Sequence, residues 1–283
     1  MNKNTDTFWD DWEAVLSNVK VNSYILNSAP NKILKNDKLM LELIAQNSSA
    51  LQYASDELRG DYDVVLAVVV RTGWALQYAS DELRYNYDIV LAAVTQNGYA
   101  LKYASDELRN NYDIVLAAVT QNGYTLDYAS NKLRDNYDIV FAAVVAGGGA
   151  LQYASGKLRN NKTIVLTAIA SDSWAFDFAS VELKTTREIV LEVVKYNCLA
   201  IYKTSPELQK DPAVIMQILM VSDEIPSKIK YIVYKSPTYI KVAINNPKIA
   251  NSNFGPGNLK IFKCKVLFQY LPFNIFDTVC VLV

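Results

Sequence analysis

The sequence predicts an all-α solenoid, or superhelix, built from tandem helix-turn-helix repeats of 25 residues. The first observation is recurrence. Residues 75–99 read ALQYASDELRYNYDIVLAAVTQNGY, and residues 100–124 differ from them only at Gln77/Lys102 and Tyr85/Asn110. The second is the helical spacing of apolar residues within each repeat, and the third is the presence of capping residues at helix ends. Such arrays stack units into one continuous core.

The first half of each repeat predicts a helix of about ten residues. Apolar residues fall at positions 2, 5 and 9, and an aromatic residue stands at position 4. Spacings of three and four residues place positions 2, 5 and 9 on one helix face. Positions are counted from Ala50, Ala75, Ala100, Thr125, Ala150, Ala175 and Ala200.

The second half, YDIVLAAVTQNG in its commonest form, predicts a second helix. Asn or Asp at position 12 is a good N-cap, and Asp at position 14 suits the positive end of the helix dipole. The segment is apolar on nearly every side, which predicts burial between neighbours. Glycine at position 24 predicts a left-handed cap. The β-branched residues also suit a strand, but the alanine pairs, caps and glycine favour a helix.

Three regions are expected along the chain. Residues 1–24 form an N-terminal cap and half repeat, residues 25–249 form the tandem repeats, and residues 250–283 form a linker and an apolar C-terminal tail. Residues 266–283 are about long enough to span a bilayer, but Gln269, Pro272, Asn274 and Asp277 interrupt them. We therefore favour a terminal helix or strand that covers the end of the array over a membrane anchor, which stays open as the alternative.

Charge is nearly balanced, with 28 basic and 29 acidic residues, which argues against a nucleic-acid partner. The distribution is uneven, however. Residues 50–149 carry 13 acidic and 7 basic residues, whereas residues 225–283 carry 8 lysines and one acidic residue. This asymmetry favours head-to-tail self-contact or an acidic partner at the C-terminal end. Ordinary solvated surfaces explain it as well, and both interpretations stay open.

Nothing in the sequence predicts catalysis. The chain has no histidine, so the commonest general base and the commonest metal ligand are missing. Its three cysteines have no CxxC spacing, which indicates a reducing, intracellular setting. No phosphate-binding loop, GxSxG sequence or zinc spacing occurs. We expect a protein that is not an enzyme and has no cofactor or metal.

The segment NGYALKYASDELRNNYDIVLAAV resembles the repeat family called domain of unknown function 4116. The resemblance covers residues 25–224 and extends weakly to residue 249. Members of that family occur mainly in amoeba-infecting giant viruses, intracellular bacteria and protists, and the family has no established activity. The resemblance therefore implies a helical repeat and nothing catalytic. Together with the reducing setting that the cysteines indicate, we expect a cytoplasmic location, in the host cytoplasm or the virion if the chain is viral. Tyrosine at position 13 departs from the family, where charged residues or proline are usual.

A row of arginines at position 10 is the first candidate interaction surface. One interpretation is a periodic binding strip for an extended peptide or an acidic partner. The other is that each arginine pairs with the Asp at position 14, or with helix carbonyls, and ties one repeat to the next. The residues of this row are Arg59, Arg84, Arg109, Arg134 and Arg159.

Aromatic residues at positions 13 and 25 form two further rows. Aromatic rows are common hot spots for binding, and they serve equally often as packing between repeats. The first row is Tyr62, Tyr87, Tyr112 and Tyr137, and the second is Trp74, Tyr99, Tyr124 and Trp174.

These observations lead to two hypotheses for function. The first is a non-enzymatic scaffold for protein–protein interaction, directed at a host protein if the chain comes from a parasite or virus. The alternative is a structural or assembly protein, of the kind found in virions, that self-associates end to end. A third class, an RNA-binding helical repeat, is disfavoured by the acidic residues 50–149.

Overall fold

The structure is a computed structural model that describes residues 8–249, apart from the side chains of residues 237, 241 and 244. Every regular element in this range is an α-helix or a 3-10 helix, so the predicted all-α repeat solenoid is confirmed. The expected linker and apolar tail, residues 250–283, lie outside the described residues. No described helix is long and apolar enough to cross a membrane.

The chain divides into two compact units, residues 1–155 and 156–283. The first contains η1 (Phe8–Asp10), α1 (Trp12–Val21), η2 (Ser23–Ser28), α2 (Asn31–Leu34), α3 (Asp37–Gln46), η3 (Ser48–Tyr53), α4 (Asp56–Gly60), α5 (Tyr62–Arg71), η4 (Gly73–Tyr78), α6 (Asp81–Arg84), α7 (Tyr87–Gln96), η5 (Gly98–Tyr103), η6 (Leu108–Asn110), α8 (Tyr112–Gln121), η7 (Gly123–Tyr128), α9 (Asn131–Arg134), α10 (Tyr137–Ala146) and η8 (Gly148–Tyr153). The second contains α11 (Gly156–Arg159), α12 (Lys162–Ser171), η9 (Ser173–Phe178), α13 (Val181–Thr185), α14 (Arg187–Tyr196), η10 (Cys198–Lys203), η11 (Leu208–Lys210), α15 (Pro212–Val221), α16 (Ser227–Lys235), α17 (Pro237–Asn245) and α18 (Pro247–Ile249).

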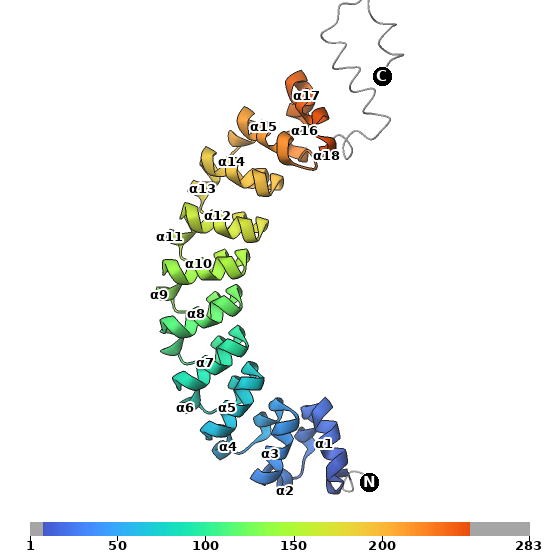
Figure 1. Cartoon of the computed structure of the whole chain (residues 1–283), viewed down its shortest axis with the longest axis vertical. Helices are drawn as coiled ribbons and strands as arrows, with labels where there is room; N and C mark the ends of the chain where they lie inside the picture. The colour runs from blue at the N-terminus through green and yellow to red at the C-terminus, as the bar shows by residue number, and fades with distance from the viewer. Residues whose placement is uncertain (1–7, 250–283) are drawn as a thin grey trace, which may run out of the picture. The chain divides into compact units, whose positions relative to one another are not determined.

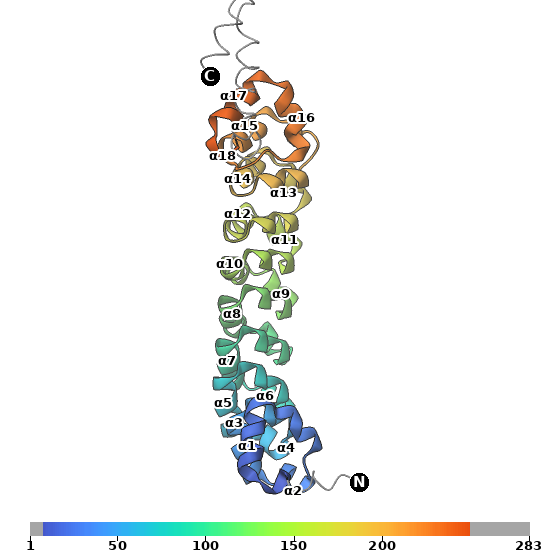
Figure 2. The same cartoon turned by 90° about the vertical axis from the view of Figure 1, so that its right-hand side faces the viewer.

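Each regular repeat supplies a long α-helix, a 3-10 helix and a short helical turn. In the first unit the long helices α5, α7, α8 and α10 stack one on the next (Figure 1). The 3-10 helices η4, η5, η7 and η8 stack in the same order, and the short helices α6 and α9 pack beside their long helices (Figure 2). Side chains from all three elements meet in a core that continues from repeat to repeat.

The long helices begin at the predicted caps. The side-chain oxygen of Asn86 accepts the N–H of Ile89 at 3.1 Å, and that of Asn111 accepts the N–H of Ile114 at 3.2 Å. Positions 15, 16, 19 and 20 are buried in α7, α8 and α10. The prediction that these helices are buried all round is wrong, because positions 14 and 21 lie on an outer side that no other described element covers; Val70 is 57% exposed.

The first half of the repeat is not one ten-residue helix, contrary to the prediction. Its 3-10 helix and short turn are separated by two extended residues, as at Ala79 (ψ 156°) and Ser80 (ψ 160°). The side-chain oxygen of Ser80 caps the short helix at the N–H of Leu83, 3.4 Å away. Positions 2, 5 and 9 are nevertheless buried as predicted, because both short elements turn the same side to the core.

The break also creates a backbone link between repeats. The N–H of Ser80 donates to the carbonyl of Arg59 at 2.8 Å, and the N–H of Ser105 donates to the carbonyl of Arg84 at 3.0 Å. In a continuous helix the backbone N–H groups of these serines would instead donate to carbonyls of the same helix. The same bond recurs at Ser130–Arg109 and Ser155–Arg134 in the first unit and at Ser180–Arg159 in the second.

Glycine at position 24 is not a left-handed cap. The cap residue is Asn97, with extended φ of −148°, and Gly98 starts the following 3-10 helix. A Cβ at Gly98 would lie 2.5 Å from the carbonyl oxygen of Ala118 in the next repeat. The N–H of Gly98 also donates to the side-chain oxygen of Gln121 at 2.8 Å. Glycine is thus required by close stacking of the repeats.

Candidate binding surfaces

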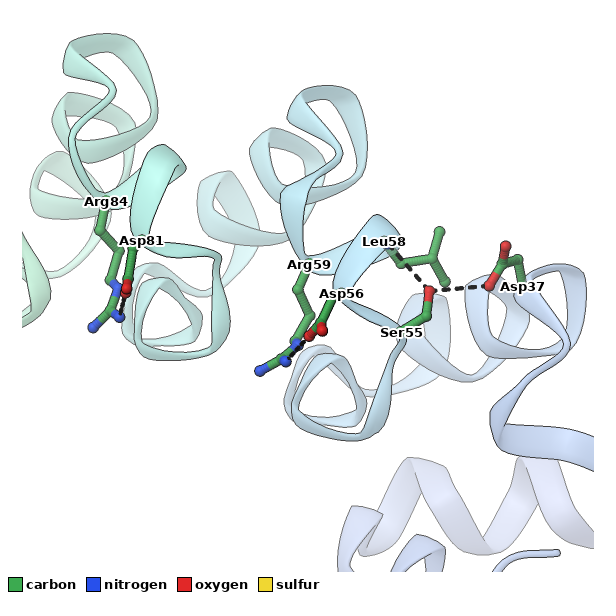
Figure 3. A network of polar contacts seen from close by, with 7 residues as sticks. All are labelled: Asp37, Ser55, Asp56, Leu58, Arg59, Asp81 and Arg84. Atoms are coloured by element: carbon green, nitrogen blue, oxygen red, sulfur yellow. Dashed lines mark hydrogen bonds and ion pairs between the residues drawn. The ribbon is translucent and has the colours of Figure 1, made fainter. Parts of the chain in front are cut away.

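The arginine row lies on the short helical turns. Arg59, Arg84 and Arg109 are about one third exposed, and each forms an ion pair with the aspartate three residues earlier, at position 7. Figure 3 shows two of these pairs, Asp56–Arg59 and Asp81–Arg84. The predicted pairing with the aspartate at position 14 is wrong, because that residue sits on the outer side of the long helix.

These ion pairs contribute little to stability. The carboxylates of Asp56, Asp81 and Asp106 are 83–91% exposed, so water screens the interaction. Their main consequence is that the arginine charge in these three repeats is already neutralised within the same turn.

The contacts of the position-10 arginine differ in repeats that have no carboxylate at position 7. Asn131 stands there in the next repeat, and the Nε of Arg134 instead donates to the carbonyl of Tyr153 at 2.6 Å. For this arginine the predicted link to a carbonyl of the following repeat is confirmed. In the second unit Gly156 occupies position 7, and the buried Nε of Arg159 has no hydrogen-bond partner among the described residues, as is also true of the Nε atoms of Arg59, Arg84 and Arg109.

The aromatic row at position 25 packs between repeats. Trp74, at the start of η4, meets Tyr103, at the end of η5, edge to face with ring centroids 5.2 Å apart. Tyr99 and Tyr128 make the equivalent pair at 6.3 Å. Such edge-to-face pairs stabilise beyond their buried area.

The row is interrupted at Gly149, the position-25 residue of its repeat. A Cβ there would collide with the phenol oxygen of Tyr124, so the Tyr124 ring occupies the space that a side chain at residue 149 would need. In the second unit Trp174 at position 25 is 59% exposed.

Burial perturbs the phenols at position 4 that face this row. The pKa of Tyr103 is raised above 10.0, first by desolvation and then by the neighbouring phenols of Tyr128 and Tyr78. The pKa of Tyr153 is raised by desolvation and then by the Asp127 carboxylate. In the first unit the position-25 and position-4 rings therefore pack against each other on the 3-10 helices, and the position-4 phenols are partly buried.

The tyrosine row at position 13 lies on the long helices instead. Tyr62, Tyr87, Tyr112 and Tyr137 are each 39–43% exposed. Tyr137 stacks on Phe141 one helical turn further on, with centroids 6.0 Å apart and planes 15° apart. The two rows therefore lie on different elements, and no ion pair or ring contact between described residues joins them.

Each surface has a shallow depression. One, of about 370 Å³, lies at the arginine row, and its lining includes Asp106, Arg109 and Tyr128. The other, of about 450 Å³, lies on the outer side of the long helices, and its lining includes Asp113 and Leu116. Among the described residues no group of three or more His, Cys, Asp or Glu side chains is placed to hold a metal.

The aspartates at position 14 are exposed surface features that the sequence pattern did not predict as a candidate site. Asp63, Asp88, Asp113 and Asp138 form no ion pair with a described residue. The sequence pattern predicted two roles for them, stabilising the helix dipole and pairing with the arginines at position 10, and neither predicts an unpaired acidic surface. The available signal was that Tyr-Asp recurs without change in four consecutive repeats.

Comparison with known proteins identifies the repeat. The family described as Domain of unknown function (DUF4116) matches at residues 11–59, 61–109, 86–134, 111–144, 136–184 and 186–225. No curated protein and no solved structure matches the chain. The matched segments cover most of the sequence in the register of the observed repeats, and the chain therefore belongs to the DUF4116 family.

Proposed function

We propose that this chain is a non-enzymatic scaffold that binds a protein partner along the outer side of its long helices. The observation that carries the proposal is the exposed tyrosine row at position 13, together with exposed apolar residues at positions 17 and 21 such as Phe141 and Val145. Aromatic side chains of this kind supply much of the binding energy at protein interfaces. The proposal places the protein inside a cell, in the host cytoplasm or virion if it is viral.

The test is site-specific photo-crosslinking with the full-length chain in its native cell. A photoreactive amino acid at Tyr112 is compared with one at Glu107, which is exposed on the short-turn side. The expected result is one protein captured from residue 112 and not from residue 107, followed by binding of that protein when purified. Identical capture from both sites, or a specific catalytic activity of the purified chain, would contradict the proposal.

A self-assembling structural protein is the second candidate. It is favoured by the opposite net charges of residues 50–149 and 225–283. Sedimentation of the full-length chain at low and high salt tests it. Salt-sensitive oligomers would favour assembly, whereas a monomer at high concentration in both conditions would exclude it.

A further inference from the structure

The outer side of the long helices in the first unit carries acidic side chains next to aromatic and apolar ones, and this combination recurs in each repeat. We define the acidic–aromatic strip as positions 13, 14 and 17 of α5, α7, α8 and α10. In each helix a tyrosine, an aspartate and a large apolar residue lie within one turn on this side. The strip consists of Tyr62, Asp63, Leu66, Tyr87, Asp88, Leu91, Tyr112, Asp113, Leu116, Tyr137, Asp138 and Phe141.

The charge of this strip is not balanced by ion pairs with other described residues. Its four aspartates are exposed and form no ion pair with a described residue, whereas the aspartates at position 7 are neutralised by arginine. The four long helices carry one basic side chain, Arg71, which points to the carbonyl of Ala45 at 3.0 Å. Four like charges repeated along one side create a field that attracts cations.

The shallow depression at Asp113 brings together an acidic, two hydroxyl-bearing and an apolar side chain. It opens between α7 and α8 and is lined by the Asp113 carboxylate, the hydroxyl-bearing Thr95 and Thr120, and the apolar Leu116. A lysine or arginine stem packs on apolar surface while its charged end meets a carboxylate. The adjacent exposed Tyr112 ring adds a face for a cation–π contact.

The spacing of the repeats favours a peptide ligand in an extended conformation. Stacked helices lie about 8–10 Å apart. An extended or polyproline-type peptide advances about 3.1–3.3 Å per residue, so every third residue meets the next repeat. A peptide with basic residues at every third position therefore matches the aspartates one for one.

From this geometry we propose that the acidic–aromatic strip binds an extended, lysine- or arginine-containing peptide segment whose cationic side chains recur about every third residue. This inference rests on the scaffold function proposed above and specifies the chemistry of its partner. It concerns residues 62–141 alone.

The experiment measures binding of four labelled peptides to the full-length chain by fluorescence anisotropy. The probe is four copies of Lys-Pro-Ala. The others are a peptide of the same composition with its lysines contiguous, four copies of Glu-Pro-Ala, and four copies of Leu-Pro-Ala. We expect the periodic lysine peptide to bind tightest and its affinity to fall with salt.

Matched variants locate the site. Asp88→Asn/Asp113→Asn removes two charges from the strip and should weaken binding about five- to tenfold. Glu82→Gln/Glu107→Gln removes the same charge from the exposed short turns and should change affinity less than about twofold. Circular dichroism checks that both variants are folded.

Four outcomes would overturn the inference: no binding of the periodic lysine peptide, equal affinity for the contiguous-lysine peptide, preference for the glutamate or leucine peptide, or equal loss in both variants. Failure here is distinguishable from failure of the scaffold function. A partner crosslinked from residue 112 while the lysine peptides do not bind would leave the scaffold standing and refute this ligand class.

Discussion

Gly98 and Ala118 approach so closely that a Cβ on Gly98 would lie 2.5 Å from the Ala118 carbonyl oxygen. The same contact recurs at Gly73 with Ala93 and at Gly123 with Ala143. Three successive repeats thus stack through a glycine on the backbone of the next long helix, and the distance between repeats depends on the missing side chain.

Gly98→Ala should destabilise the protein by about 1–3 kcal/mol, because a methyl group in a packed site must displace backbone. Urea unfolding followed by circular dichroism measures the change. Gly60→Ala is the matched control, since its nearest neighbour would be a Ser80 side-chain atom at an ordinary 3.7 Å. An unchanged midpoint for Gly98→Ala would show that the repeats can separate without cost.

Ser130→Ala should cost about 1 kcal/mol of stability. The Ser130 hydroxyl oxygen accepts the N–H of Leu133 at 3.3 Å, and the hydroxyl donates to the side-chain oxygen of Asn110 at 2.7 Å. Ser130→Asp keeps the cap and should recover part of the loss. If the Ala and Asp variants unfold at the same urea concentration, capping is not the reason for serine at position 6.

Tyr103→Phe should reduce the loss of stability at alkaline pH. The pKa of Tyr103 is raised in the folded protein, so the neutral phenol contributes stability that is present below pH 10.0 and lost as pH rises through the folded value. Unfolding of wild type and variant is compared at neutral and alkaline pH. A difference between them that stays constant across this range would contradict the prediction.

Asp211→Asn should weaken the acid sensitivity of the second unit. Arg187 Nε donates to Asp211 at 2.8 Å, and this hydrogen bond lowers the Asp211 pKa below 3.8. A lowered carboxyl pKa contributes stability above about pH 4 that is lost as pH falls through the folded value. Urea unfolding between about pH 5 and pH 2 measures it, and parallel pH curves for wild type and variant would disprove it.

Local signals in the sequence predicted the long helices well. The caps at Asn86 and Asn111 and the first-turn aspartates follow from hydrogen bonding and the helix dipole within about ten residues. The same logic failed for the first half of the repeat. Its apolar spacing is helical, but Ser80 uses its backbone N–H for the preceding repeat and its side chain for the next turn.

For the candidate surfaces, too, the sequence predicted some features and not others. Periodicity identified the rows at positions 10, 13 and 25, because a residue type that recurs every 25 residues must form a row in a stacked array. It could not assign partners to them. Arg59 pairs with Asp56 rather than with Asp63, since the latter faces outward on a different helix.

By itself, the sequence of this protein determined that it is a helical repeat array, that positions 2, 5 and 9 of the repeat are buried, and where the long helices begin, since these follow from periodicity and capping within one repeat. Tertiary structure alone decided that glycine at position 24 serves stacking and that the aspartates at position 14 remain without a partner among the described residues. The physical reason is that each of these properties depends on the distance and orientation between neighbouring elements, and the order of residues within one repeat does not contain either.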